Sequence, residues 1–378
     1  MSRAWEQLAA LPLDVSGYAV ERLERAVSSG FVRVSTVVRL EGRDGAVGVG
    51  EDVTYDAEDH EDYPRGLPLA GSFTLASFSA LLGELEAAGP PTGFTADSAV
   101  DPAEHLSAMS PGGAGLFSRP PLSDMSRQHR RWAFESAALD LALRQSRLSL
   151  GAAVDLPYRP LRFVVSTRLD IRPWLALYPE LEFKLDPTPD WDDELVERIA
   201  ATGAVRVVDF KGYYRGTPVD VEPDPALYAR VVRRFPDAIV EDAAVTGATC
   251  SALGDSLERL SWDAPIHSWA DVELMARVTA LDVPRYLNIK PSRFGTAQAL
   301  FDCIGRAQER GITLYGGGQF ELGPGRSQVQ ALASLFYADA PNDVAPSGFN
   351  ELEPAPGLPH SPLSPPARPL GLSFDAAG

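Results

Sequence analysis

From residue 162 to 345 the chain repeats one pattern of hydrophobic and polar positions: a short apolar run stops on a polar or charged side chain, and a helix-length spacer follows. Strands that alternate with helices of this length are typical of parallel pairing. In a (β/α)₈ barrel the residues at the C-terminal ends of the strands converge on one mouth. The pattern therefore predicts a TIM-like (β/α)₈-type barrel with these strand ends at its rim: Ser166, Lys184 and Asp186, Asp209 and Lys211, Glu241 and Asp242, His267, Asn288 and Lys290, Gln319 and Glu321, and Asn342 and Asp343.

The N-terminal part of the chain has a different pattern. Residues 31–40 alternate in part between apolar and polar positions, as a strand does, and Arg43-Asp44-Gly45 is a hairpin signal before a second strand at 46–51. Residues 72–88 have the character of a helix, and residues 127–148 have a broad apolar face at helical spacing. We therefore predict an α+β region ahead of the barrel.

These elements suggest a division into two domains. We predict an α+β capping domain at residues 1–126 and a barrel catalytic domain at 127–350. The proline-rich tail, residues 351–378, still carries apolar residues, and we expect it to pack back on the capping domain.

Composition narrows the classes of function. The net charge of −18 argues against nucleic acid as a partner and disfavours anionic membrane surfaces. Cys250 and Cys303 supply neither a disulfide framework nor a thiolate metal cluster. No apolar run approaches membrane-spanning length and no signal segment is visible, so we expect a cytoplasmic protein.

Three segments together resemble the enolase superfamily, in its muconate-lactonising enzyme and mandelate racemase branch, which includes o-succinylbenzoate synthase-like members. Residues 39–51 are similar to the hairpin of that family's capping domain, and residues 133–143 to the helix that leads into its barrel. The resemblance covers roughly residues 18–350. The order of the functional strand ends also follows the family: Lys184, Asp209, Glu241, a residue of the fifth strand, Lys290, and a glycine-rich segment with Glu321.

This resemblance implies removal of the proton next to a substrate carboxylate, with the enolate held on Mg²⁺. A hard divalent cation stabilises the charge that develops on the enolate, and lysines on either side of the substrate act as acid and base. The partner would then be a small carboxylate substrate, handled by a lyase, racemase or cycloisomerase. Self-association of the chain is an expectation from analogy with other barrel enzymes. The roles implied are metal binding by Asp209 and Glu241 and catalysis by Lys184, Lys290 and Asp186.

The end of the fifth barrel strand departs from the family pattern, which has an acidic residue there. We place His267 at this position, because the nearest carboxylate, Asp271, has the character of a helix start. A histidine here either binds the divalent metal, although Mg²⁺ prefers oxygen, or hydrogen-bonds a carboxylate at the rim.

Two further positions depart from the family as well. Lys211 stands where the family has a small polar residue. It either substitutes for the charge of the metal by pairing with Asp209 or Glu241, or points away along the rim. Lys184 and Asp186 replace a Lys-x-Lys pair and share one face of their strand. Either Asp186 occupies the position of the base, or the register shifts by two and Lys184 is the base.

The remaining candidates are substrate contacts. Ser166 ends the first barrel strand, and Gln319 and Glu321 lie in a glycine-rich segment that can present backbone N–H groups to an anion. Lys211 is a fourth candidate. The remaining histidines, including His60 and His129, are expected in loop or surface contexts.

Three functions compete on this sequence. The first is the metal-dependent lyase or isomerase that the resemblance implies. The second is a catalytically drifted, metal-free member of the fold that binds a small molecule, because three positions depart from the pattern at once. The third is an unrelated barrel enzyme, such as an aldolase, in which Lys290 forms a Schiff base.

Overall fold

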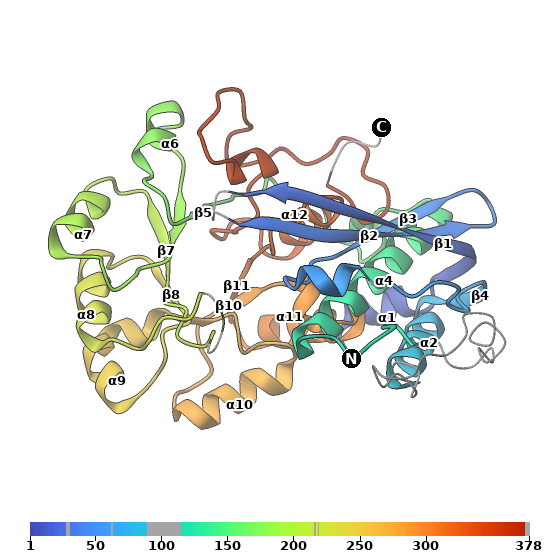
Figure 1. Cartoon of the computed structure of the whole chain (residues 1–378), viewed down its shortest axis with the longest axis horizontal. Helices are drawn as coiled ribbons and strands as arrows, with labels where there is room; N and C mark the ends of the chain where they lie inside the picture. The colour runs from blue at the N-terminus through green and yellow to red at the C-terminus, as the bar shows by residue number, and fades with distance from the viewer. Residues whose placement is uncertain (28–30, 62, 89–114, 215–216, 218, 375–378) are drawn as a thin grey trace, which may run out of the picture.

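Two sheets organise the chain in the computed structural model, which describes residues 1–27, 31–61, 63–88, 115–214, 217 and 219–374 (Figure 1). The first is an antiparallel sheet of four strands in the order β3-β2-β1-β4. The second is a parallel sheet of seven strands in the order β11-β10-β9-β8-β7-β6-β5. This arrangement confirms the prediction of a TIM-like barrel with an α+β capping domain.

The longest antiparallel pairing in the capping sheet is between β1 and β2. Strands β1 and β2 pair from Val15 to Ala26 of β1. The predicted turn forms between β2 and β3 at Gly45, whose φ of 84° favours glycine. In Figure 1 the ribbon of β1 and β2 reaches across towards the barrel. The elements of this domain are α1 (Arg3–Ala9), β1 (Pro12–Ala26), β2 (Val32–Gly42), β3 (Val47–Asp52), a 3₁₀ turn (Ala57–His60), β4 (Gly71–Thr74) and α2 (Leu75–Ala88).

Helix α4 (Asp124–Gln145) joins the capping sheet to the barrel. It confirms the long apolar helix predicted from the sequence and is buried along most of its length. Gly48 and Gly50 of β3 lie directly against it, because an added Cβ would come within 2.2 Å of the Ala137 carbonyl oxygen and within 2.0 Å of that of Ala133. Any larger side chain at these two positions would push the helix away from the sheet.

The barrel strands are short and nearly all buried. They alternate with helices on the outside, as the sequence predicts (Figure 1). Parallel bridges from Phe163 to Asn342 and from Gly317 to Asp343 join the two edges of the sheet, so that residues 342–343 stand in the place of an eighth strand. The strands are β5 (Val165–Thr167), β6 (Phe183–Leu185), β7 (Val205–Asp209), β8 (Ile239–Glu241), β9 (Leu260–Trp262), β10 (Tyr286–Ile289) and β11 (Thr313–Gly316). The main helices are α5 (Leu150–Ala153), α6 (Arg172–Leu177), α7 (Asp193–Ala200), α8 (Pro225–Arg234), α9 (Gly247–Leu253), α10 (Trp269–Thr279), α11 (Ala297–Glu309) and α12 (Gly325–Phe336).

The C-terminal tail contacts the barrel and helix α4. Leu363 bridges to Leu161 beside the barrel, and the backbone N–H of Leu372 donates to Asp140 of α4 at 2.8 Å. The domain boundary at residue 126 and the packing of the tail on the capping domain stay predictions. Within the described ranges, no helix has the length and apolar character to cross a membrane.

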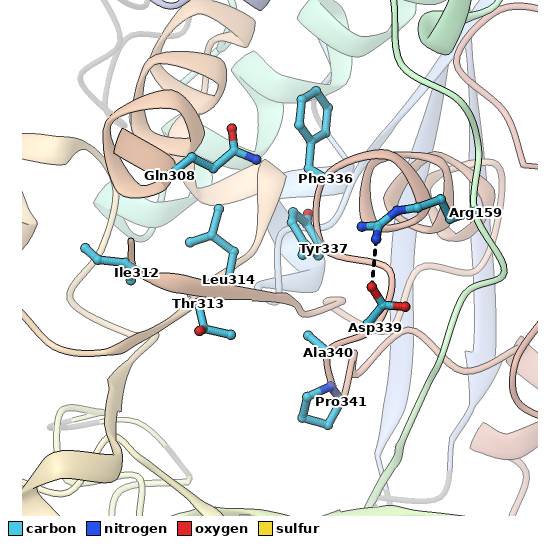
Figure 2. Close-up of a pocket in the computed structure, with 10 residues that line it drawn as sticks. All are labelled: Arg159, Gln308, Ile312, Thr313, Leu314, Phe336, Tyr337, Asp339, Ala340 and Pro341. Carbon is cyan, nitrogen blue, oxygen red and sulfur yellow. Dashed lines mark hydrogen bonds and ion pairs between the residues drawn. The ribbon is translucent and has the colours of Figure 1, made fainter. Parts of the chain in front are cut away.

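A cavity of about 420 Å³ opens at the end of the barrel where the strands begin (Figure 2). It is lined by the start of β11 and by the C-terminal ends of α11 and α12, and the ion pair of Arg159 with Asp339, at 2.7 Å, stands beside it. The strand ends predicted to carry chemistry lie at the opposite end of β11, so this cavity is separate from them.

Candidate active site

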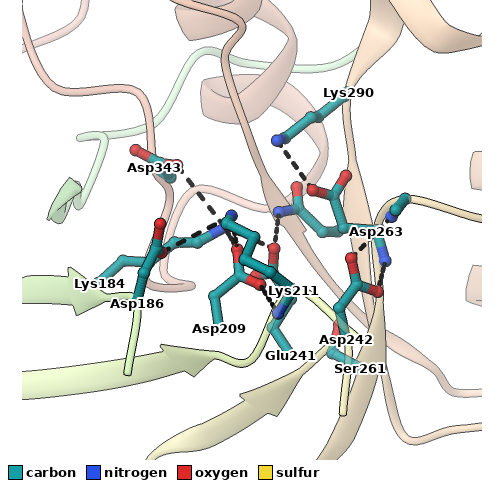
Figure 3. A network of polar contacts seen from close by, with 12 residues as sticks. Lys184, Asp186, Asp209, Lys211, Glu241, Asp242, Ser261, Asp263, Lys290 and Asp343 are labelled. Atoms are coloured by element: carbon teal, nitrogen blue, oxygen red, sulfur yellow. Dashed lines mark hydrogen bonds and ion pairs between the residues drawn. The ribbon is translucent and has the colours of Figure 1, made fainter. Parts of the chain in front are cut away.

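Three buried carboxylates meet at the C-terminal ends of neighbouring strands. Asp209 ends β7, Glu241 ends β8, and Asp263 directly follows β9. One oxygen of each lies within 4.8 Å of the others, and all three residues are at most 1% exposed. Figure 3 shows the three side chains pointing towards one another. Parallel strands in register, with Asp209 opposite Glu241, bring these groups together.

Asp263 is a residue that the sequence analysis missed, and the prediction of His267 at the end of the fifth strand was wrong. Strand β9 ends at Trp262, and His267 lies in the turn before α10. Its Nδ1 is 3.2 Å from the carbonyl oxygen of Arg293, and its backbone N–H donates to Asp271. The error arose because β9 has only three residues and directly follows a 3₁₀ turn (Gly254–Arg259) that has the character of a helix in the sequence.

Lys184 lies between two of the three carboxylates. Its Nζ is 2.5 Å from Oε1 of Glu241, 3.0 Å from Oδ2 of Asp209 and 3.8 Å from Oδ2 of Asp343. The side chain is 1% exposed. Burial alone would lower the pKa of Lys184, but Asp209 and Glu241 raise it well above its ordinary value. In this structure Lys184 is therefore a buried counter-charge of Asp209 and Glu241.

Lys211 also turns towards the carboxylates rather than away from them. Its Nζ contacts Oδ2 of Asp209, the oxygen that Lys184 also contacts, and it lies 3.6 Å from Oδ1 of Asp186. Burial opposes the charge, but Asp186 and Asp209 raise the pKa of Lys211 well above its ordinary value. Although burial favours the neutral acid, Lys184 and Lys211 hold the pKa of Asp209 below its usual range.

Lys290 follows β10 and faces Asp263. Its Nζ is 2.8 Å from Oδ2 of Asp263, which also accepts a hydrogen bond from the Tyr214 hydroxyl at 2.8 Å. Burial would raise the pKa of Asp263, but Arg293 and Lys290 hold it well below the usual range. The other oxygen of Asp263, Oδ1, is buried 3.6 Å from Nε of Arg293 and has no hydrogen-bond partner among the residues that the structure describes.

Glu241 is held by neutral donors as well as by Lys184. The side-chain amide of Asn288 donates to Oε1 at 3.1 Å, and the Tyr315 hydroxyl donates to Oε2 at 2.6 Å. Burial and the neighbouring Asp209 raise the pKa of Glu241 well above its ordinary value. Beside it, Asp242 accepts the backbone N–H groups of Asp263 and Ala264, both at 2.9 Å, and fixes the turn that carries Asp263.

All the lysine residues of the chain lie at this site. Of the 34 lysines and arginines in the chain, only three are lysines, and Lys184, Lys211 and Lys290 are all buried here. Arginine supplies the positive charge everywhere else. The scarcity of lysine is visible in the sequence and favours the interpretation in which Lys211 pairs with a carboxylate of the site.

The other predicted residues surround this group. Asp186 pairs with Arg168 at 3.0 Å, and Ser166 of β5 is the register partner of Lys184 on β6. Gln319 and Glu321 lie in the turn between β11 and α12.

The capping domain covers that turn. The Tyr55 hydroxyl donates to the side chain of Gln319 at 3.0 Å, and the side-chain carboxylate of Glu321 pairs with Arg326 at 2.9 Å. Glu51, at the end of β3, accepts backbone N–H groups from Leu322, Gly323 and Gly325. The capping domain therefore fixes the backbone beside the mouth of the barrel.

The carboxylates fit a hard divalent cation. Three carboxylates supply the oxygen ligands that Mg²⁺ prefers. Oδ1 of Asp263 is a buried acceptor that lies 3.6 Å from Nε of Arg293 and has no hydrogen-bond partner among the described residues. In the part of the chain that the structure describes, this is the one group of His, Cys, Asp and Glu side chains close enough to hold a metal. A metal ion at this site would compete with the ammonium groups of Lys184 and Lys211, which contact oxygens of Asp209 and Glu241.

Two family models match most of the chain. Models of the N-terminal and C-terminal domains of a family described as "Domain of unknown function (DUF8230)" match residues 6–96 with 104–153, and residues 157–351. No curated protein matches the chain.

Solved structures of enolase-superfamily proteins share the fold. A dipeptide epimerase from Methylococcus capsulatus, complexed with a Mg ion, is 17% identical with a TM-score of 0.62, over 97% of this chain and all of that one. A member of the enolase superfamily from Listeria innocua is 18% identical with a TM-score of 0.58, over 89% of this chain and 86% of that one. The muconate lactonizing enzyme from Pseudomonas putida is 17% identical with a TM-score of 0.57, over 95% and 96%.

Proposed function

Because this chain belongs to the DUF8230 family, whose function is unknown, we propose its function from the site itself: an enzyme that removes the proton next to the carboxylate of a small substrate. The observation that carries the proposal is the group of three buried carboxylates, Asp209, Glu241 and Asp263, on neighbouring strand ends. The enolase-superfamily fold of the neighbouring structures supports it. The reaction class is that of a lyase, racemase or cycloisomerase.

The three carboxylates would hold Mg²⁺, which supplies the positive charge that stabilises an enolate when it is bound. Lys290 is the candidate for moving the proton, because its Nζ stands at the edge of the group and is held by Asp263 at 2.8 Å. Lys184 stays a buried cation and adds to the positive field. Ser166 and Gln319 are the candidate contacts for the rest of the substrate.

Aspartate substitutions test the metal site. We expect wild-type protein, freed of metal and then titrated with Mg²⁺ in a calorimeter, to bind one equivalent. Asp263→Asn removes a ligand charge and is expected to weaken binding by at least about tenfold. Asp271→Asn is the matched control, since Asp271 caps the turn at His267 and Ser268 and lies outside the carboxylate group.

Proton exchange tests the reaction. With Mg²⁺ and a panel of carboxylic acids in D₂O, we expect the wild type to exchange an α-proton for deuterium, as measured by proton NMR. Asp263→Asn and Lys290→Met should lose the exchange, and Asp271→Asn should keep it. Absence of both metal binding and exchange in the wild type would refute the proposal.

A metal-free binding protein is a second candidate, and one observation favours it. The ammonium groups of Lys184 and Lys211 already pair with Asp209 and Glu241, so these carboxylates have counter-charges without a metal. Stoichiometric binding of Mg²⁺ that Asp263→Asn weakens would exclude this candidate.

A further inference from the structure

We propose that Lys211 is a displaceable counter-cation. Its ammonium group occupies Asp209 until a divalent cation binds there, and then transfers to Asp186. The inference rests on the proposed metal site. Beyond that site, we infer that Lys211 and its alternative partner Asp186 tune the affinity for the divalent cation, although neither residue binds it.

Residue 211 engages both oxygens of Asp209. The ammonium group contacts Oδ2, and the backbone N–H lies 3.3 Å from Oδ1. Lys184 shares Oδ2 at 3.0 Å. A metal ion can take Oδ2 only if an ammonium group gives it up, because two cations and a metal cannot share one oxygen without strong repulsion.

Lys211 has an alternative partner close by. Oδ1 of Asp186 lies 3.6 Å from its Nζ, and this buried oxygen has no hydrogen-bond partner among the described residues. The second oxygen of Asp186 is fixed by Arg168 at 3.0 Å, so the carboxylate is already oriented. Figure 3 shows the ammonium group of Lys211 between Asp186 and Asp209. A small side-chain rotation moves it from one to the other.

Lys184 lacks this freedom. Its side chain is 1% exposed, whereas that of Lys211 is 11% exposed. Its ammonium group is surrounded by Glu241, Asp209 and Asp343, all of which belong to the site itself. Lys211 is therefore the cation that can leave, and its contact with the Tyr214 ring, 5.0 Å from Nζ to the ring centre, borders the path.

The test is a double-mutant cycle read by Mg²⁺ calorimetry. Lys211→Met removes the competing cation, and we expect it to tighten Mg²⁺ binding by about tenfold, within the usual range of coupling between sites. Asp186→Asn removes the alternative partner and should weaken binding by a similar factor. In the Lys211→Met background, Asp186→Asn should leave the affinity for Mg²⁺ unchanged, because the ammonium group that would move to Asp186 is absent.

A second readout follows the lysine side chains of the wild-type protein directly. Labelling with lysine enriched in ¹³C at Cε gives one resonance for each of the three lysines. Saturating Mg²⁺ should shift the Lys211 resonance, assigned with Lys211→Arg, and Asp186→Asn should change that shift.

Three outcomes separate the inference from the function on which it rests. If the wild type binds Mg²⁺ and Lys211→Met binds it no more tightly, the inference is refuted and the metal site stands. If Asp186→Asn weakens binding equally in both backgrounds, or the Lys211 resonance does not move, the transfer to Asp186 is refuted. If neither the wild type nor Lys211→Met binds Mg²⁺, the metal site is refuted together with the inference.

Discussion

Removing the ammonium group of Lys184 is expected to destabilise the protein strongly. In Lys184→Met the side chain keeps a similar length, but Glu241 and Asp209 lose the cation that stands 2.5 and 3.0 Å from their oxygens. At an effective dielectric constant of about 20, each contact is worth roughly 6 kcal/mol of gross attraction. Most of that offsets the cost of burying the ions, so breaking a buried pair has a net cost of about 3–5 kcal/mol.

Equilibrium unfolding in guanidinium chloride with EDTA present measures this loss. Glu241→Gln in the Lys184→Met background removes one of the two unpaired carboxylates, and we expect the double variant to be more stable than Lys184→Met alone. Arg198→Met is the control for an exposed pair, because Arg198 and Glu194 are 48% and 82% exposed, and it should cost less than about 1 kcal/mol. A loss below about 1 kcal/mol for Lys184→Met, or no recovery in the double variant, would contradict the electrostatic argument.

Two further substitutions test other parts of the structure. Glu51→Gln replaces a carboxylate oxygen that accepts backbone N–H groups with a donor, so it should lower the free energy of unfolding by about 1–3 kcal/mol in the same assay; an unchanged value would show that the contact is dispensable. His129 is buried, and neither of its ring nitrogens has a hydrogen-bond partner within the described part of the chain. Burial, opposed by Asp52 and reinforced by Arg293, Arg33 and His267, lowers its pKa to about 3. The unfolded chain therefore takes up a proton near its ordinary pKa of about 6.5 while the folded chain does not, and the wild type loses stability as the pH falls from 6.5 towards 3. His129→Leu should lack this pH dependence, so its free energy of unfolding should rise relative to that of the wild type by up to about 2 kcal/mol as the pH falls from about 7 to 5. A difference between the two proteins that does not change with pH would contradict this reasoning.

The sequence predicts the fold better than it predicts the site. Apolar runs that end on Asp209, Glu241 and Lys290 were sufficient to predict the barrel, because period and spacing carry that information. Asp263 was missed because β9 is only three residues long and follows a 3₁₀ turn that has the character of a helix in the sequence. The expectation of a loop or surface context was wrong for His129, which is buried in α4, and His60 is buried in the 3₁₀ turn between β3 and β4.

The direction of Lys211 could not be derived from its position in the chain. Its backbone has a φ of 56°, which turns the residue out of the strand geometry, and its side chain selects Asp209 and Asp186 only in the folded structure. Spacing along a sequence specifies which strand end carries a charge. It does not specify which of several carboxylates shares an oxygen with which ammonium group.

The close contact of Gly48 and Gly50 with α4 has a consequence for how the molecule unfolds. Because α4 is buried between the capping sheet and the barrel, neither part can expose its core without breaking the surface that the helix shares with both. Calorimetry should show a single cooperative heat-absorption peak rather than one peak for each domain. The capping sheet is then expected to stay fixed on α4 rather than to rotate as a hinged cover.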